Sequence, residues 1–513
     1  MTSRRQAVQV PDLSWVRSRL QVGASSYAVA IGGVTVFALL VRVIALGHQP
    51  LGGDESFTAL VSRRDWLDMY AAVRSDSGAP LSYALTHLMS SVSGDAAMLR
   101  LPAALAGTAA VPLVAALARR IGGDRAGMWA ALASAVVPAL VLPARDARMY
   151  ALSGTLVLML TLTLWRGVER PSQRRLLTHA LVFAAAVLCD YFALFAALAS
   201  LLAAVAAFRP SRQVALRVAT ATVLGCAALL VWLPFATAQV HHAQQPFWLD
   251  GIDFAGAVRG VLSGFFGGPP IDPRLPQHAT LVALQGVGIA GVAIAALALL
   301  LPIGRPPWVR ARSSLGYVLG CGLGATLLIG LVSIARPVLD ARYVSVVWTP
   351  LFALLGVGLA RLRWRASLAV VCMAIATLSM SVVITRADIG SLVRDRLDGH
   401  VGSGVLVLAV PDTYIEVLAT ADSDVVARTH IATPMPPWYF GVAAYPRGAV
   451  IDALPPGTRV VDVITQSGDS QPRLVDHAVM LTRSCTALAC FTAYAVAPLA
   501  IGAVARVSSG DPR

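Results

Sequence analysis

Long apolar runs alternate with short polar segments along most of the chain, and this pattern predicts a protein that crosses a membrane many times. A helix needs about 20 apolar residues to span the hydrocarbon core of a bilayer. Two neighbouring runs are shorter than this and are separated only by Asp190. We predict eleven spans, at about residues 24–46, 97–118, 126–144, 147–165, 176–189, 191–208, 215–236, 279–302, 314–335, 343–360 and 366–385.

Arginines gather in every second polar segment, and this bias predicts the orientation of the chain, because cytoplasmic loops carry an excess of basic residues. Residues 1–23 carry four arginines and no cleavage signature. We therefore expect a cytoplasmic N-terminal segment and a retained first helix, not a signal peptide. The same rule puts the following segments outside: 47–96, 145–146, 237–278, 336–342 and the tail from residue 386.

Composition supports this prediction. The 513 residues are 57% hydrophobic, only 13% are charged, and the mean hydropathy is +0.70. Soluble domains contain about 25% charged residues. The net charge of +14 could suggest nucleic acid, but the basic residues are all arginines and lie in short clusters between apolar runs. We therefore expect a polytopic α-helical protein surrounded by lipid bilayer, with no nucleic-acid partner.

The tail differs from the rest of the chain. Residues 405–410, 425–432 and 459–465 are strand-like and separated by proline and glycine turns, and 412–421 has helical spacing. We predict three regions: a cytoplasmic segment 1–23, a transmembrane domain 24–385 with a catalytic outer loop 47–96, and an extracytoplasmic α/β domain 386–513. Cys485 and Cys490 lie in this tail, and their spacing leaves a disulfide and two free thiols equally open.

Two adjacent acids, Asp54 and Glu55, follow the first span directly, after Gly52 and Gly53. Judged by charge alone, they are equally well explained as solvated loop acids. Their position changes this, because a carboxylate held at the rim of the bilayer suits general-base chemistry. Neighbouring side chains point different ways, so one acid can accept a proton while the other orients a partner.

Two arginine-containing motifs fall on the same outer side, ARDARMYAL at 144–152 and ARPVLDARYVS at 335–345. A guanidinium binds phosphate oxygens through its planar fork. The alternative for any single arginine is a membrane anchor whose charged head reaches the interface. Acids and arginines on one face suit a phosphorylated lipid, held by its phosphate while a hydroxyl is deprotonated. The motifs supply five candidates: Arg145, Asp146, Arg148, Arg336 and Arg342.

The outer segment 237–278 offers weaker candidates. His241, His242 and Trp248 could contact a sugar, although an aromatic belt at the interface is the usual explanation for such a tryptophan. Two histidines without a nearby carboxylate are a weak metal motif, so we predict no metal. No phosphate-binding glycine motif lies on a strand–helix unit, so we expect no nucleotide or other cofactor.

Five segments together resemble one known superfamily. They are VRVIALGHQPLGGDES (41–56), LRLPAALAG (99–107), ARDARMYAL (144–152), PFWL (246–249) and DARY (340–343). They resemble the polyprenyl-phosphate-sugar-dependent glycosyltransferases of the GT-C superfamily, in particular glycosyltransferase family 39, the protein mannosyltransferase group. The resemblance covers about residues 30–360 and implies a GT-C-like helical bundle.

The resemblance also implies roles for individual residues. Asp54 would be the catalytic base of an inverting transfer, and Glu55 would support it or contact the acceptor. Asp146 corresponds to an acidic position of the second outer loop. Arg342 and Tyr343 correspond to an arginine–tyrosine pair that faces the lipid phosphate. Many relatives carry His-Pro-Pro where this chain has Gly78, Ala79 and Pro80, so the acceptor class stays open.

Our hypothesis is a membrane glycosyltransferase that takes mannose from a polyprenyl-phosphate donor and passes it to an envelope glycolipid, polysaccharide or protein. An arabinofuranosyltransferase of the same superfamily is the second candidate. A transporter or flippase for lipid-linked sugar and a scaffold for envelope assembly are alternatives from other classes. The enzyme hypothesis requires Asp54 and Arg342 to meet in one place at the outer face of the bacterial cytoplasmic membrane.

Overall fold

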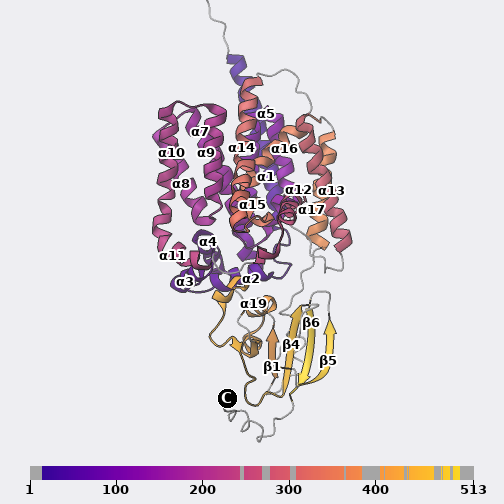
Figure 1. Ribbon diagram of the computed structural model, residues 1–513. Helices are drawn as coiled ribbons and strands as arrows, with labels where there is room; N and C mark the ends of the chain where they lie inside the picture. Colours follow the sequence, from indigo (N-terminus) through magenta and orange to yellow (C-terminus); the bar gives the residue numbers. More distant parts are fainter. Residues whose placement is uncertain are drawn as a thin grey trace, which may run out of the picture.

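The apolar runs form helices that lie along one another, with a small domain at one end of the bundle (Figure 1). This computed structural model describes residues 14–242, 248–267, 278–300, 308–362, 365–383 and, with short gaps, 405–496. The bundle contains α1 (Ser14–Val43), α5 (Ala96–Val136), α6 (Pro138–Val141), η1 (Pro143–Arg145), α7 (Tyr150–Glu169), α8 (Gln173–Cys189), α9 (Ala193–Phe208), α10 (Arg212–Cys226), α11 (Ala228–His242), α12 (Phe254–Gly267), α13 (His278–Leu297), α14 (Trp308–Ala335), α15 (Ala341–Trp348), α16 (Phe352–Leu359) and α17 (Arg365–Val383).

The helical, membrane-spanning fold class predicted from the sequence is confirmed. Among the described residues, six helices are long and apolar enough to cross a membrane, or seven if the bent pair α10–α11 forms one span. Helix occurs in each of the eleven predicted segments, but some of these helices are short. For example, α8 has 17 residues and α9 has 16. The number eleven therefore stays a prediction.

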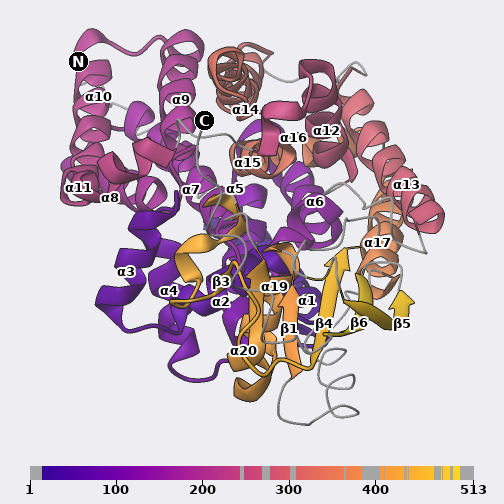
Figure 2. The ribbon, with the colours of Figure 1, turned by 60° about the horizontal axis from the view of Figure 1, so that its bottom comes forward.

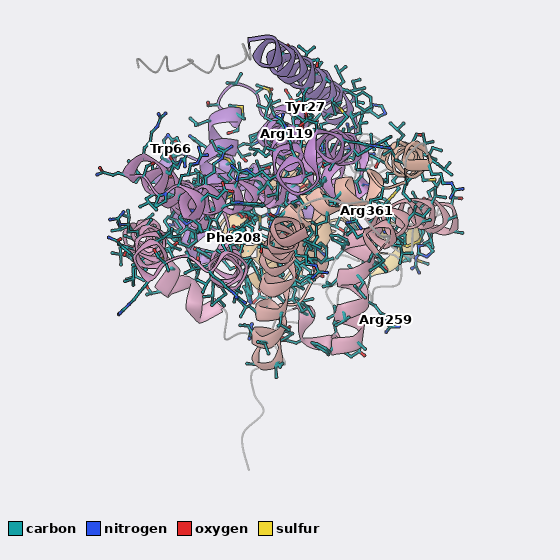
Figure 3. All side chains as sticks on the ribbon, turned by 90° about the horizontal axis from the view of Figure 1, so that it is seen from above. Tyr27, Trp66, Arg119, Phe208, Arg259 and Arg361 are labelled. Atoms are coloured by element: carbon teal, nitrogen blue, oxygen red, sulfur yellow. A yellow bond between two sulfur atoms is a disulfide. The ribbon has the colours of Figure 1, made fainter. Side chains whose placement is uncertain are left out.

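Helix α5 joins two predicted spans at a sharp kink. Gly123 has a φ of +78°, in the left-handed region that glycine adopts without steric cost. Arg119 and Asp124 bridge the kink with an Nε–Oδ1 distance of 2.5 Å. The Arg119 guanidinium also lies 4.3 Å from the centre of the Tyr27 ring of α1 (Figure 3). This contact ties α1 to α5.

The loop between α1 and α5 folds into α2 (Gly53–Ser62), α3 (Trp66–Ser75) and α4 (Pro80–Ser90). These helices lie at the same end of the bundle as the C-terminal domain (Figure 1). Helix α3 buries Met69, Ala72 and Val73, while Trp66 and Leu67 are 42% and 84% exposed. This division suits a helix lying along a membrane surface.

The C-terminal domain is a six-stranded sheet in the order β3-β2-β1-β4-β6-β5. Strands β1, β2, β3 and β4 are paired in parallel, and β6 is antiparallel to both β4 and β5. Figure 2 shows the sheet and its helices from the free end of the domain, with α19 over α2. The elements are β1 (Val405–Ala409), α19 (Pro411–Thr420), α20 (Ser423–Arg428), β2 (Thr429–Ala432), β3 (Val450–Ile451), β4 (Val460–Gln466), β5 (Val479–Cys485) and β6 (Ala489–Ala495).

One strand prediction in this domain is wrong over half its length. Residues 425–432 were expected to be a strand, but α20 continues to Arg428 and only Thr429–Ala432 is extended. Parallel strands need a crossover connection, and α19 with α20 supplies it between β1 and β2. Cys485 and Cys490 form a disulfide across the β5–β6 hairpin. The predicted domain boundary near 386 lies outside the described residues.

Candidate functional site

The two adjacent acids of the loop between α1 and α5 lie in different surroundings. Helix α2 begins at Gly53, so Asp54 and Glu55 stand in its first turn, where a helix favours negative charge. The Glu55 side chain is 2% exposed, whereas the Asp54 side chain is 51% exposed. One acid is therefore part of the protein interior and the other faces outward.

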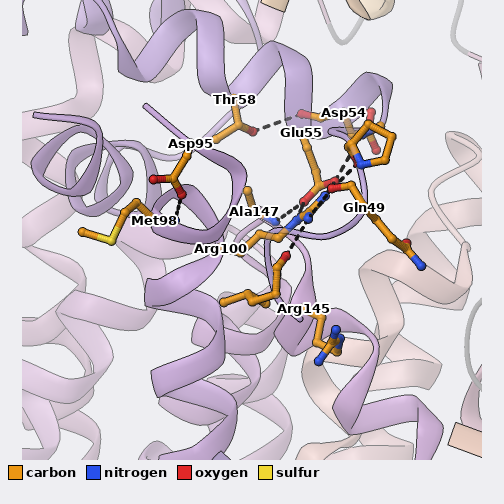
Figure 4. A network of polar contacts seen from close by, with 12 residues as sticks. Gln49, Asp54, Glu55, Thr58, Asp95, Met98, Arg100, Arg145 and Ala147 are labelled. Carbon is orange, nitrogen blue, oxygen red and sulfur yellow. Dashed lines mark hydrogen bonds and ion pairs between the residues drawn. The ribbon is translucent and has the colours of Figure 1, made fainter. Parts of the chain in front are cut away.

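Glu55 is held by Arg100 of α5 in a bidentate ion pair (Figure 4). Arg100 donates from Nε to Oε1 and from Nη2 to Oε2, each at 2.7 Å. The backbone N–H groups of Ala147 and Gly52 donate to the same carboxylate at 2.8 and 3.2 Å. Because both oxygens are engaged inside the protein, the predicted alternative in which Glu55 contacts the acceptor does not fit this geometry.

Arg100 also holds the loop that precedes α2. Its Nη1 and Nη2 donate to the backbone carbonyls of Leu46, Gln49 and Pro50 at 2.8 to 2.9 Å. The sequence interpretation quoted the motif LRLPAALAG but gave this arginine no role. The available signal was a charged residue at the start of a long apolar run, where an unpaired charge is costly.

Asp54 meets Arg342, as the enzyme hypothesis requires. The distance from Asp54 Oδ2 to Arg342 Nη1 is 3.0 Å, and the Arg342 side chain is 44% exposed. Asp340 caps α15 by accepting from the Arg342 backbone N–H at 2.8 Å, and its Oδ1 lies 3.8 Å from Arg342 Nε. The start of α15 thus places a guanidinium beside the outward-facing acid.

Arg148 contacts the backbone of Asp54 and the side chain of Thr58. Its Nη1 donates to Thr58 Oγ1 at 3.1 Å and to the Asp54 backbone carbonyl at 3.3 Å. Burial lowers the pKa of Arg148, but four nearby groups together outweigh burial and hold that pKa above its usual value: Asp54, Tyr83, Tyr150 and Asp76. The residue lines a small recess beside α2 whose other polar residues are Thr58, Ser82, Tyr83 and Thr86.

Arg145 does not join this group, although the sequence suggested that it binds the donor phosphate. Its guanidinium donates to the carbonyls of Val41, Arg42, Ile44 and Ala45 at 2.9 to 3.2 Å. These carbonyls lie at the C-terminal end of α1, where the last helical acceptors lack intrahelical donors. Arg145 therefore satisfies the end of α1, and its role at the donor phosphate stays a prediction.

The remaining candidates are placed as follows. Asp146 is partly buried just after η1, next to the Ala147 amide that binds Glu55. Tyr343 stacks on Phe192 with ring centres 5.1 Å apart. Arg336 directly follows α14 and is partly buried. His241 and His242 end α11 and Trp248 begins η2 (Trp248–Gly251), but their side chains lie outside the described residues.

Asp190 is a buried acid that the sequence interpretation noted only as a break between two spans. It ends α8, is 5% exposed, and accepts from the Phe192 N–H at 2.9 Å. Burial raises the pKa of this carboxyl to about 6. The charge of Arg148 lowers the pKa of Asp190, so Asp190 interacts electrostatically with a residue that contacts Asp54. In the described part of the chain, no three His, Cys, Asp or Glu side chains form a metal-binding group.

Comparisons with known proteins agree with this fold. The family model of dolichyl-phosphate-mannose-protein mannosyltransferases matches residues 77–237, a stretch that includes Arg100 and Arg148 but neither Asp54 nor Arg342. The apo structure of ArnT from Cupriavidus metallidurans matches with a TM-score of 0.54 and 16% identity, over 92% of this chain and 98% of that one. No curated protein matches the sequence significantly.

Two further structures give weaker matches. The Archaeoglobus fulgidus oligosaccharyltransferase, solved with zinc and sulfate, has a TM-score of 0.48 at 12% identity over 85% of this chain and 68% of that one. Arabinosyltransferase EmbB from Mycobacterium smegmatis has a TM-score of 0.40 at 14% identity, over 86% and 42%. The ArnT match shows that this chain shares the fold of that structure, and the family match over residues 77–237 agrees with the resemblance drawn from the sequence.

Proposed function

We propose that this chain is an inverting glycosyltransferase that moves mannose from a polyprenyl-phosphate donor to a hydroxyl group of an envelope glycolipid, polysaccharide or protein. The observation that carries the proposal is the Asp54–Arg342 pair. A half-exposed carboxylate and a half-exposed guanidinium lie 3.0 Å apart. One can accept a proton, and the other can bind a phosphate.

The proposed reaction is a single displacement. The acceptor oxygen attacks the anomeric carbon of the sugar, and its proton passes to the Asp54 carboxylate. The bond between that carbon and the phosphate oxygen breaks, and the electron pair leaves with the polyprenyl phosphate. The leaving group is already a stable anion, so this step uses a base and a phosphate-binding cation and needs no further cofactor.

The Arg342 guanidinium links donor binding to the base. It lies within 4 Å of the carboxylates of both Asp54 and Asp340. A donor phosphate would compete for the same guanidinium, because Arg binds phosphate in a bidentate geometry. The Asp54 carboxylate would then be released from its partner at the moment when the sugar arrives. Tyr343, one residue further along α15, is the proposed companion of Arg342 on the donor side.

Glu55, Arg100 and Arg148 are proposed to position the base. Glu55 and Arg100 fix the first turn of α2 from the interior of the protein. Arg148 holds the Asp54 carbonyl and the Thr58 hydroxyl from the side. A base displaced by about 1 Å can lose a factor of about 100 in rate, so such supports matter for catalysis.

We further propose that the site and the C-terminal domain lie outside the bacterial cytoplasmic membrane. The positive-inside distribution of arginines supports this side, and so does the Cys485–Cys490 disulfide, because disulfides persist in oxidising compartments. The donor would then be carried in the outer leaflet, next to the acceptor.

The test uses the purified full chain in lipid nanodiscs with radiolabelled polyprenyl-phosphate mannose and an envelope glycan extract as acceptor. We expect labelled product from the wild-type protein. Asp54→Asn should reduce it by at least about 100-fold, the usual range for loss of a general base. Asp124→Asn, at the kink of α5, is the control acid and should leave transfer unchanged.

Retained transfer by the Asp54→Asn protein would remove Asp54 from the mechanism. A parallel assay with polyprenyl-phosphate arabinofuranose identifies the sugar, and product from that donor alone would replace mannose. Movement of labelled lipid across vesicles without product would instead identify a transporter.

A further inference from the structure

Helix α2, which carries Asp54, is held from two opposite directions. Glu55 faces the bundle through its ion pair with Arg100. Phe57, two residues further on, belongs to a hydrophobic cluster that also contains Ile415 of α19 and Ala444 of the C-terminal domain. The C-terminal domain is thus packed directly on the helix that bears the proposed base (Figure 2).

Polar contacts continue this packing at both ends of α2. At its C-terminal end, Arg63 donates from Nη1 to the Ala419 carbonyl of α19 at 2.9 Å. At its N-terminal end, Glu416 of α19 reaches Gly53, the residue before Asp54. Its Oε1 lies 3.6 Å from the position that a Cβ of residue 53 would occupy. The contact therefore runs along the whole length of the helix.

Gly441 is a tightly packed part of this contact. It is buried, its φ is +77°, and a Cβ at this position would lie 2.9 Å from Phe57 Cδ2 and 3.2 Å from Ile415 Cδ1. Both distances are shorter than ordinary van der Waals contact, so an added methyl group has to displace the Phe57 ring or α19. The missing side chain of Gly441 is what lets the domain approach α2 this closely.

We propose that the C-terminal domain is a positioning element of the active site, which acts through the contact of Gly441 and Ile415 with Phe57. Asp54 and Phe57 are three residues apart on one helix, so they move together. The interior ion pair fixes one side of α2, and the docked domain fixes the other, which keeps Asp54 opposite Arg342. The sugar-transfer assays that test this proposal rest on the function proposed above.

The chain offers a matched control for this test. Gly448 belongs to the same domain and has the same φ of +77°, but nothing lies within 4 Å of a Cβ built there. Gly441→Ala and Gly448→Ala therefore introduce the same methyl group at the same unfavourable backbone angle. Only the first meets Phe57, so a difference between the two variants reports the contact with α2.

Transfer is measured with polyprenyl-phosphate mannose for the full chain in nanodiscs. For Gly441→Ala we expect kcat to fall at least about 10-fold while KM for the donor stays within about 2-fold, because the base moves and the phosphate contact does not. Gly448→Ala should keep kcat within about 2-fold of wild type. Combining Gly441→Ala with Phe57→Leu removes the ring atom that the methyl meets, and should recover most of the lost rate.

Hydrogen exchange of residues 53–62, followed by mass spectrometry, gives a readout that needs no substrate. We expect faster exchange in the Gly441→Ala protein, wild-type exchange in Gly448→Ala, and slower exchange again in the double variant. Equal behaviour of the two glycine variants in exchange would overturn the proposal, as would equal kcat values. If wild-type protein fails to use the donor, the proposed function fails, while the exchange comparison still decides whether the domain fixes α2.

Discussion

Asp54 Oδ2 and Arg342 Nη1 lie 3.0 Å apart although 288 residues separate them along the chain. This pair differs from the Glu55–Arg100 pair next to it, whose side chains are both 2% exposed. An exposed ion pair contributes little to stability because water screens it. The Asp54–Arg342 pair is therefore suited to exchange its partners for substrate groups, while the buried pair is suited to hold the helix.

Replacing Arg342 should weaken donor binding more than it slows chemistry. For Arg342→Gln we expect KM for polyprenyl-phosphate mannose to rise about 10-fold or more, since a charged hydrogen bond to phosphate is lost. Steady-state kinetics on the nanodisc protein measure this change. Arg259→Gln, an exposed arginine of α12, is the control and should leave KM unchanged. An unaltered donor KM in the Arg342 variant would contradict the phosphate assignment.

Breaking the interior ion pair should destabilise the protein. Arg100→Met leaves the Glu55 carboxylate buried without its cation, which typically costs about 3 kcal/mol or more. The Arg120–Glu169 pair is 28% and 48% exposed, and its removal by Arg120→Met should cost less than about 1 kcal/mol. Thermal unfolding of the two variants in detergent gives the comparison. Similar losses in both would show that Arg100 is not the anchor of α2.

Asp190 should make stability depend on pH. Burial raises its pKa in the folded protein from 3.8 to about 6. A raised carboxyl pKa stabilises the fold fully below about pH 4, and that stabilisation is lost as the pH rises through about 6. The loss corresponds to about 3 kcal/mol. Asp190→Asn should remain neutral at every pH and should therefore flatten the melting temperature between pH 4 and pH 7. An unchanged pH profile would exclude Asp190 as its source.

The disulfide at the β5–β6 hairpin gives a test of sidedness. In intact cells, a membrane-impermeant maleimide should label Cys485 and Cys490 only after reduction, because the structure joins the two sulfurs. The four other cysteines are free and lie in the helical bundle, where Cys189 and Cys321 are buried. A Cys485→Ser, Cys490→Ser protein provides the background signal. Labelling without reductant, or none after reduction, would argue against an oxidised outer domain.

Much of the fold followed from local patterns in the sequence. Apolar runs predicted helices because bilayer thickness sets a minimum length, and the proline and glycine turns of the tail separated β1 from β4. The prediction of a strand over 425–432 was wrong in its first half. Parallel strands β1 and β2 need a helical crossover between them, and the local residues do not reveal that the two strands are parallel. The kink at Gly123 falls between the predicted spans 97–118 and 126–144, so the polar break in the sequence did mark a change in the course of the helix.

The site was predictable only in part. Asp54 and Arg342 stood out because charges beside apolar runs are costly unless they have a use. Sequence spacing could not separate the roles of neighbouring charges. Glu55 is interior while Asp54 faces outward, and Arg145 binds the end of α1 while Arg148 contacts Asp54. These differences depend on which helix packs against each residue, and that is decided only when the helices assemble.

The residues that contact helix α2 come from successively later parts of the chain. Arg100 and Ala147 hold Glu55, Arg342 meets Asp54, and Gly441 reaches Phe57. Because a ribosome makes the chain from its N-terminus, the segment with the acids leaves the membrane insertion machinery long before its supports exist. A half-made protein therefore carries its acids in an unfinished setting, and the surroundings of Asp54 become complete only when the last domain has folded onto α2.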